Sequence, residues 1–294
     1  MKLSDFFELT LLASIWGASF LFMRIASPEL GPILLMTLRV GIAAICLLPV
    51  LFYYKQGPEL GKHWRHLFIV GLVSTALPFT LFGYATLSLP AGITSVLNTT
   101  TPMFGVIIAL FWFKEKITLP VITGLGIGVM GIYLLMFDKL HLETDNSIML
   151  PTAATFVATF CYALSANYTK KYLSGVKPLV QATGSLVAAT LILLPFSIFN
   201  LPENDISTKV IISTGLLGVI CTAVAYILFF RLLANVGPNK AISVTYLIPI
   251  FGVFWGSILL DENITLTMIP GVVIVLLGVA LSTGFIKRPN KRTQ

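Results

Sequence analysis

Two short polar stretches interrupt apolar sequence, and both contain residue types that can bind a small molecule. The first is NTTTP at Asn98–Pro102, and the second is TYLIP at Thr245–Pro249. A proline inside a helix leaves the carbonyl four residues earlier without its usual donor. Each stretch therefore offers a freed carbonyl beside an amide or hydroxyl side chain. The chemistry this permits is hydrogen bonding to a ligand, and the alternative is that Pro102 and Pro249 are only structural kinks satisfied by neighbouring groups.

Helical spacing indicates which polar residues of these stretches share a helical face. Asn98, Thr101 and Pro102 are three and four residues apart, so they share one helical face, as do Thr245 and Pro249. Thr99 and Thr100 point elsewhere, and we expect them to bond to backbone carbonyls or neighbouring helices. The two stretches are thus predicted to place one polar face each at a similar depth.

Aromatic residues with polar tips lie near the middle of other apolar segments. Such tips need hydrogen-bond partners when they are buried, so these side chains either line a cavity or pack against other helices. We predict a cavity wall. The predicted cavity residues are Trp16, Asn98, Thr101, Tyr162, Tyr226, Thr245 and Tyr246.

Arg39 is the only charge well inside an apolar segment. Charges within a membrane indicate a functional site by default, which predicts a substrate-facing or gating role for Arg39. The alternative is that the long side chain reaches the external interface from its depth.

Composition excludes most other classes of function. The chain of 294 residues is 56% hydrophobic and 11% charged, which indicates an integral membrane protein. Its net charge of +7 comes from short basic clusters between apolar segments, so it does not suggest nucleic acid. The three histidines and all carboxylates fall at loops or segment ends, which argues against an intramembrane enzyme. We therefore predict no catalytic residues, no cofactor and no metal.

Apolar segments of about 20 residues predict ten membrane-spanning helices in an all-α protein. Fifteen lysines and arginines fall on one side of this arrangement and three on the other, which predicts both termini in the cytoplasm. The predicted spans are 6–25, 32–54, 66–88, 91–113, 118–137, 149–169, 178–199, 209–234, 240–260 and 266–286.

The two halves of the sequence resemble each other. Residues 102–131 align without a gap on 249–278, an offset of 147 that matches Pro102 to Pro249. Because each half has five spans, the halves must enter the membrane from opposite sides, and such inverted repeats hold a substrate site between them. The predicted domains are a repeat at 1–140, a repeat at 149–286 and a basic cytoplasmic tail at 287–294.

The sequence is similar to the EamA family of the drug/metabolite transporter superfamily over essentially its whole length. The motifs that carry the resemblance are WGASF (16–20), LRVGIAA (38–44), TPMFGVIIALFWFKEKIT (101–118) with GLGIGVMGIYLL (124–135), and IPIFGVFWGSILLDENIT (248–265) with GVVIVLLGVAL (271–281). The resemblance implies a ten-helix transporter of small organic solutes in the bacterial inner membrane, and it favours export. It does not name the solute.

We therefore predict a secondary transporter of an amino-acid-like or similar neutral or zwitterionic metabolite, working by alternating access. A channel or a lipid scramblase is the alternative, followed by an intramembrane enzyme. The expected partners are the substrate and the lipid bilayer, and the oligomeric state is left open. Small residues permit close helix packing, and the glycines predicted to do so are Gly124, Gly131, Gly271 and Gly278.

Overall fold

The chain is mostly helical in the part that the computed structural model describes, which is residues 2–114, 118–142, 148–241, 243–265 and 268–283. The basic tail predicted at 287–294 lies outside these residues. Within them, the elements are α1 (Leu3–Tyr53), α2 (Gly57–Val70), π-helix η1 (Gly71–Ala76), α3 (Leu77–Ala85), α4 (Ala91–Asn98), α5 (Thr101–Trp112), α6 (Leu119–Leu142), α7 (Met149–Tyr172), α8 (Pro178–Ile198), α9 (Thr208–Gly218), π-helix η3 (Val219–Val224), α10 (Ala225–Val236), α11 (Pro238–Ala241), α12 (Val244–Leu260) and α13 (Met268–Ser282).

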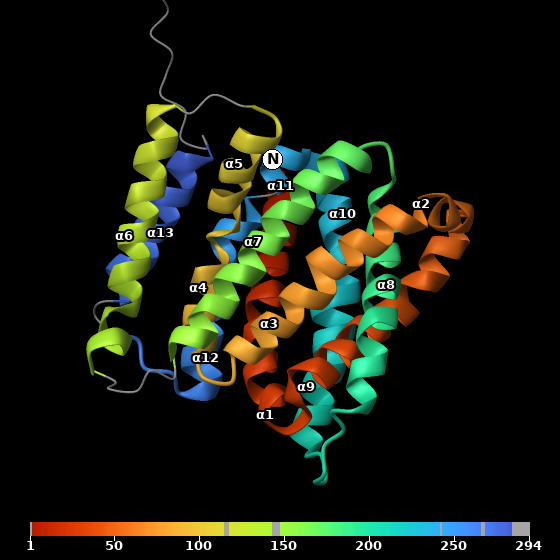
Figure 1. Cartoon of the computed structure of the whole chain (residues 1–294), viewed down its shortest axis with the longest axis horizontal. Coiled ribbons are helices and arrows are strands. Elements are labelled where there is room, and N and C mark those ends of the chain that lie inside the picture. The colour runs from red at the N-terminus through yellow and green to blue at the C-terminus, as the bar shows by residue number, and fades with distance from the viewer. Residues whose placement is uncertain (1, 115–117, 143–147, 242, 266–267, 284–294) are drawn as a thin grey trace, which may run out of the picture.

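The helices are those of a membrane protein. In the described part of the chain, seven helical stretches are long and apolar enough to cross a bilayer, and α12 and α13 are shorter apolar helices. The core lies where α1 meets α3, α8, α9 and α12 (Figure 1). Small and aliphatic side chains fill it, including Ala26, Val40 and Leu186, which are fully buried.

Helix α1 contains two of the predicted spans and bends between them. Its 51 residues would extend about 76 Å if straight, more than twice the thickness of a hydrocarbon core. The bend is at Gly31, which has φ 71° and ψ 154° between Pro28 and Pro32. Only glycine adopts this backbone conformation readily, so the sequence allows the chain to reverse here without a longer loop.

Gly31→Ala is expected to lower the free energy of unfolding by about 1–2 kcal/mol, because alanine is strained at this φ. No atom of the described residues lies within 4 Å of the position that its Cβ would take, so the effect comes from the backbone alone. The unfolding temperature of purified protein in detergent measures it. Gly61→Ala is the control, because Gly61 is equally open but has an ordinary helical φ. Equal stability of the two variants would contradict the prediction.

Two long helical stretches share an unusual feature. The stretches Gly57–Ala85 and Thr208–Val236 each contain one π-helical turn, η1 and η3, near their middle. Such turns are rare and are often found at functional sites. A glycine that approaches another helix closely is the first residue of η1 and directly precedes η3. A Cβ on Gly71 would lie 2.8 Å from the carbonyl oxygen of Ser185, and one on Gly218 would lie 3.3 Å from that of Arg39.

Helices α6 and α13 stand together at one side of the molecule (Figure 1). The structure places all four glycines predicted to pack helices at this crossing. A Cβ on Gly131 would lie 2.5 Å from the backbone nitrogen of Val275, and one on Gly271 would lie 2.9 Å from that of Leu135. A Cβ on Gly124 or Gly278 would overlap the backbone of the opposite helix. The backbones can approach this closely because no side chain separates them.

Candidate functional site

A central cavity of about 290 Å³ lies between the two halves of the chain. This volume is at the lower end of the range for small-molecule sites, so the cavity fits a compact metabolite. The residues that line it are Trp16, Ser19, Phe20, Met23 and Arg39 from α1; Ser74 from η1; Phe79 and Phe82 from α3; Asn98, Thr99, Thr101 and Pro102 from α4, α5 and the turn between them; Tyr162 from α7; Cys221, Thr222 and Tyr226 from η3 and α10; and Thr245 and Ile248 from α12.

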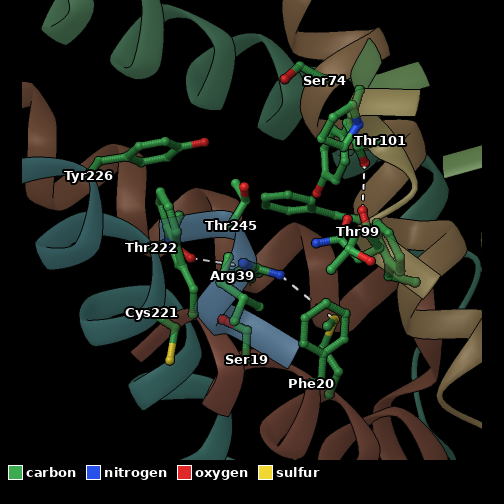
Figure 2. A pocket seen from close by; sticks show the side chains of 18 residues that line it. Ser19, Phe20, Arg39, Ser74, Thr99, Thr101, Cys221, Thr222, Tyr226 and Thr245 are labelled. Atoms are coloured by element: carbon green, nitrogen blue, oxygen red, sulfur yellow. Dashed lines mark hydrogen bonds between the residues drawn. The ribbon is translucent and has the colours of Figure 1, made fainter. Parts of the chain in front are cut away.

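The structure brings most of the sequence-predicted residues together around this cavity. Arg39 and Pro102 line it, as do six of the seven residues predicted for its wall. Figure 2 shows Arg39 near the centre of the group, with Tyr226 and Thr245 on the same cavity. The six are Trp16, Asn98, Thr101, Tyr162, Tyr226 and Thr245.

Tyr246 lies outside this cavity, contrary to the prediction. Its hydroxyl is 2.9 Å from the hydroxyl of Thr283, just beyond the end of α13. Adjacent residues of a helix point about 100° apart, so Tyr246 cannot share the direction of Thr245. Pro249 lies inside α12 and is buried, and the cavity is lined there by its neighbour Ile248.

The segment around Pro102 is a broken helix. The sequence predicts one kinked helix over 91–113, whereas α4 ends at Asn98 and α5 begins at Thr101. The hydroxyl of Thr101 donates to the carbonyl of Asn98 at 2.8 Å, so the carbonyl freed by the proline is satisfied locally. The amide oxygen of Asn98 is different, because it is buried and has no hydrogen-bond partner among the described residues.

The other two threonines of this stretch have separate contacts. The hydroxyl of Thr100 donates to the carbonyl of Leu97 at 2.8 Å and lies 3.2 Å from the hydroxyl of Thr159 on α7. That of Thr99 donates to the carbonyl of Val96, and Thr99 also lines the cavity. Thr100 thus bonds a neighbouring helix as expected, while Thr99 also borders the site.

Arg39 extends into the cavity rather than to the external interface. Only 6% of the residue is exposed. Its Nε donates to the hydroxyl of Thr222 at 3.0 Å, and its guanidinium carbon lies 3.9 Å from the centre of the Phe79 ring. One Nη atom lies 3.8 Å from the sulfur of Met23. The stacked ring and the hydroxyl together fix the orientation of the guanidinium.

Aromatic side chains form much of the wall and support one another. The ring of Tyr162 lies 5.7 Å from that of Phe82 and 6.3 Å from that of Phe79. Trp16 packs on Phe229 at 5.4 Å. Rings at such separations gain stability beyond their burial, so the wall holds its shape around the polar groups.

Sequence reasoning missed several lining residues, and Thr222 is the most informative. Its hydroxyl donates to the carbonyl of Leu217, five residues earlier, which is the spacing of a π-helix. Its remaining lone pair accepts from Arg39. A signal was present, because Thr222 and Thr75 are equivalent at the offset of 147 that relates the two halves.

Helices α4 and α12 both contribute residues to the cavity wall and are in close contact with each other. The carboxylate of Glu262, just after α12, accepts hydrogen bonds from the backbone of Ala91 at 2.6 Å and of Gly92 at 3.1 Å, the first residues of α4. Negative charge is favourable at a helix N-terminus. A Cβ on Gly252 would overlap Ser95 of α4, so the two helices touch through small residues.

The equivalent position in the first half has different surroundings. Gly105 on α5 is the residue equivalent to Gly252 at the 147-residue offset. No described atom lies within 4 Å of the position that a Cβ on Gly105 would take. Gly105 instead accepts a hydrogen bond from the side chain of Asn167 on α7 at 3.3 Å through its carbonyl, so the two equivalent glycines have different neighbours.

Comparison with known proteins places the chain in a family. The model of the EamA-like transporter family matches residues 7–137 and again residues 150–284. An uncharacterised transporter of Bacillus subtilis, YoaV, is 25% identical over 272 residues, which are 92% of this chain and 93% of that protein. A probable amino-acid metabolite efflux pump of Escherichia coli is 24% identical over 286 residues, 92% of each chain.

The fold is shared with a solved protein. A crystal structure that is 14% identical in sequence superimposes with a TM-score of 0.67, covering 98% of this chain and 100% of the other. The two matches of the family model, together with the apolar helices, show that this multi-pass membrane protein belongs to the EamA-like transporter family.

Proposed function

We propose that the protein is a secondary transporter that carries a small organic metabolite across the bacterial inner membrane by alternating access, in the direction of export. The observation that carries this proposal is the central cavity, to which both halves of the chain contribute. A site between two halves is the arrangement that alternating access requires. The name of the Escherichia coli relative, an efflux pump, supports the direction.

The proposed architecture has ten crossings in two inverted repeats of five helices. The bend at Gly31 divides α1 into two crossings. The other six long apolar stretches and the two shorter helices, α12 and α13, supply the remaining eight. The uneven distribution of lysine and arginine supports both termini in the cytoplasm. In this orientation Glu262 and the start of α4 lie at the external face.

The proposed substrate is amino-acid-like or a similar neutral or zwitterionic solute. The cavity combines aromatic faces with hydroxyl and amide groups, which suits a compact molecule that is partly apolar. Its volume of about 290 Å³ accommodates a single small metabolite and little else. The relative's name, which refers to amino-acid metabolites, supports this class.

Flux through proteoliposomes tests the transport mechanism. A carrier gives influx of labelled solute that saturates with concentration and that rises when unlabelled solute is loaded on the opposite side. A channel gives flux that does not saturate, and a scramblase moves labelled lipid without any solute. Either of these two results, or conversion of the solute into a product, would overturn the proposal.

Asn98→Ala and Tyr162→Ala are each expected to lower the rate of exchange at low substrate concentration by about tenfold, the equivalent of one lost hydrogen bond or ring contact. Both side chains line the cavity. Initial rates at several concentrations measure the effect. The matched controls are Asn200→Ala and Tyr54→Ala, which change exposed residues that do not line the cavity. Wild-type rates with an unchanged half-saturating concentration would show that these residues do not contact the substrate.

A further inference from the structure

We propose that Arg39 and Thr222 form a subsite for the carboxylate of the substrate, and that the amide oxygen of Asn98 accepts a hydrogen bond from the substrate's amino or hydroxyl group. The substrate class is thus a small organic carboxylate that carries a donor group on a largely apolar body. This inference rests on the transport function proposed above. It assigns one charged and one neutral subsite within the same cavity.

The first argument is that the charge of Arg39 has no counter-ion among the residues that the structure describes. No carboxylate of the described residues lies within ion-pair distance of it; Glu8 pairs with Arg231, and Glu262 binds the start of α4. Arg39 is also the only charged residue among those lining the cavity. A buried charge without a partner is costly, and a ligand with one negative charge removes that cost when it binds.

The second argument concerns the hydrogen-bond donors of the guanidinium. Thr222 accepts from Nε, and the sulfur of Met23 is a weak acceptor for one Nη. The remaining N–H groups have no partner among the described residues. They belong to the two Nη atoms, which form the planar fork that matches a carboxylate. Phe79 covers one face of the fork, so a ligand approaches along its edge.

Charge balance distinguishes a carboxylate from a phosphate. One guanidinium neutralises one carboxylate. A phosphate monoester carries about −1.5 to −2 at neutral pH, and the described cavity wall offers no second cation for the excess. The carboxylate group itself is therefore balanced by Arg39 alone, whereas a phosphate would leave excess negative charge buried.

The third argument is the unpartnered amide oxygen of Asn98, which is buried beside the cavity. A buried acceptor without a donor is unfavourable. An amino or hydroxyl group on the ligand supplies the donor. Arg39 and Thr222 come from α1 and η3, while Asn98 comes from the end of α4, so one ligand touches elements of both halves.

Thr222 is a positioning residue in this subsite. Its hydroxyl hydrogen is engaged by the carbonyl of Leu217 at 2.8 Å, which turns a lone pair toward Arg39. Thr75 is the equivalent residue in η1, and its hydroxyl is buried without a hydrogen-bond partner among the described residues. Thr75→Val is therefore the matched control for Thr222→Val, because valine has the shape of threonine and lacks its hydroxyl.

The experiment is a thermal-shift titration of purified protein with matched probes. Leucine and phenylalanine each carry the carboxylate, and leucinamide and phenylalaninamide lack it; 4-methylpentanoate has the carboxylate without the amino group. We expect the two amino acids to stabilise the wild type, 4-methylpentanoate to bind more weakly, and the two amides to cause no shift, because ligand binding raises the unfolding temperature.

Substitutions in the cavity show which residues bind the carboxylate and the amino group of the probes. Arg39→Gln is expected to raise the half-saturating concentration of the amino acids by at least about tenfold, while the unliganded protein melts no earlier, because an unpaired buried charge has been removed. Thr222→Val is expected to raise it roughly threefold to tenfold, Thr222→Ser to restore it, and Thr75→Val to leave it unchanged. Asn98→Ala is expected to weaken binding of the amino acids but not of 4-methylpentanoate.

Three results would overturn the inference: no shift with any carboxylate, equal shifts with acids and amides, or wild-type affinity in Arg39→Gln and Thr222→Val. The same compounds in proteoliposomes separate this inference from the transport proposal. Binding of the acids without saturable flux would contradict transport and leave the subsite standing. Saturable flux of the amides that Arg39→Gln does not alter would leave transport standing and contradict the subsite.

Discussion

Gly278→Ala is expected to lower the free energy of unfolding by about 3 kcal/mol or more, because the crossing of α6 and α13 has no space for a methyl group. A Cβ on Gly278 would overlap the backbone nitrogen of Gly128, and would lie 2.5 Å from its Cα and 2.7 Å from the carbonyl oxygen of Gly124. All three atoms are backbone, so no side chain can rotate away. The helices must separate, and the whole contact between them weakens.

The unfolding temperature in detergent and the monodisperse fraction on size exclusion measure this loss. Gly126→Ala is the control, since Gly126 is exposed on the other face of α6 and its Cβ would meet no atom of the described part of the chain within 4 Å. We expect Gly126→Ala to match the wild type or exceed it slightly, because alanine favours helix. If Gly278→Ala is as stable as Gly126→Ala, the crossing is not packed as described.

Glu262→Gln is expected to lower the free energy of unfolding by about 2 kcal/mol. The carboxylate accepts from the backbone of both Ala91 and Gly92, one with each oxygen. Glutamine has one acceptor oxygen and places an N–H group against the other backbone donor. The substitution also removes a negative charge from the N-terminus of α4. The N-cap residue there, Pro90, makes no side-chain hydrogen bond to the helix.

The same substitution elsewhere provides the control for Glu262. Glu59 is a partly exposed carboxylate, 3.6 Å from Lys177, and pairs of this kind add little stability. Glu59→Gln is therefore expected to leave the unfolding temperature nearly unchanged. Glu262→Gln should lower the unfolding temperature by several degrees. In domains somewhat smaller than this chain, each kcal/mol of lost stability lowers that temperature by roughly 2–4 °C. Equal melting of the two variants would show that Glu262 does not hold α4 and α12 together.

The sequence was most informative where a polar residue stood in an apolar segment. Asn98, Thr101 and Arg39 are conspicuous there because each is costly in lipid, and all three line the cavity. Tyr246 shows the limit of this reasoning. Polarity places a residue at a depth in the membrane, but the direction of its side chain depends on the rotation of the helix, which packing against other helices sets.

Other features depended on contacts between distant segments. Glu262 lies 170 residues along the chain from Gly92, and its position after α12 alone does not show which helix it binds. Thr222 resembles any hydroxyl in a helix until the π-helical turn of η3 is known. The sequence also did not show that the chain reverses at the single residue Gly31. The segment between the two predicted spans is helical on both sides of this glycine, so no separate loop marks the turn.

The glycine crossing of α6 and α13 has a consequence for the origin of the fold. Gly131 contacts Val275, and Gly278 contacts Gly128. The second pair consists of the repeat equivalents of the first: Gly131 corresponds to Gly278, and Val275 corresponds to Gly128, at the offset of 147. Gly124 with Ser282 and Gly271 with Leu135 obey the same rule. An interface in which each surface meets its own equivalent is isologous, the kind found in two-fold symmetric homodimers. The crossing therefore has the geometry of a dimer interface between two identical subunits, joined here in a single polypeptide.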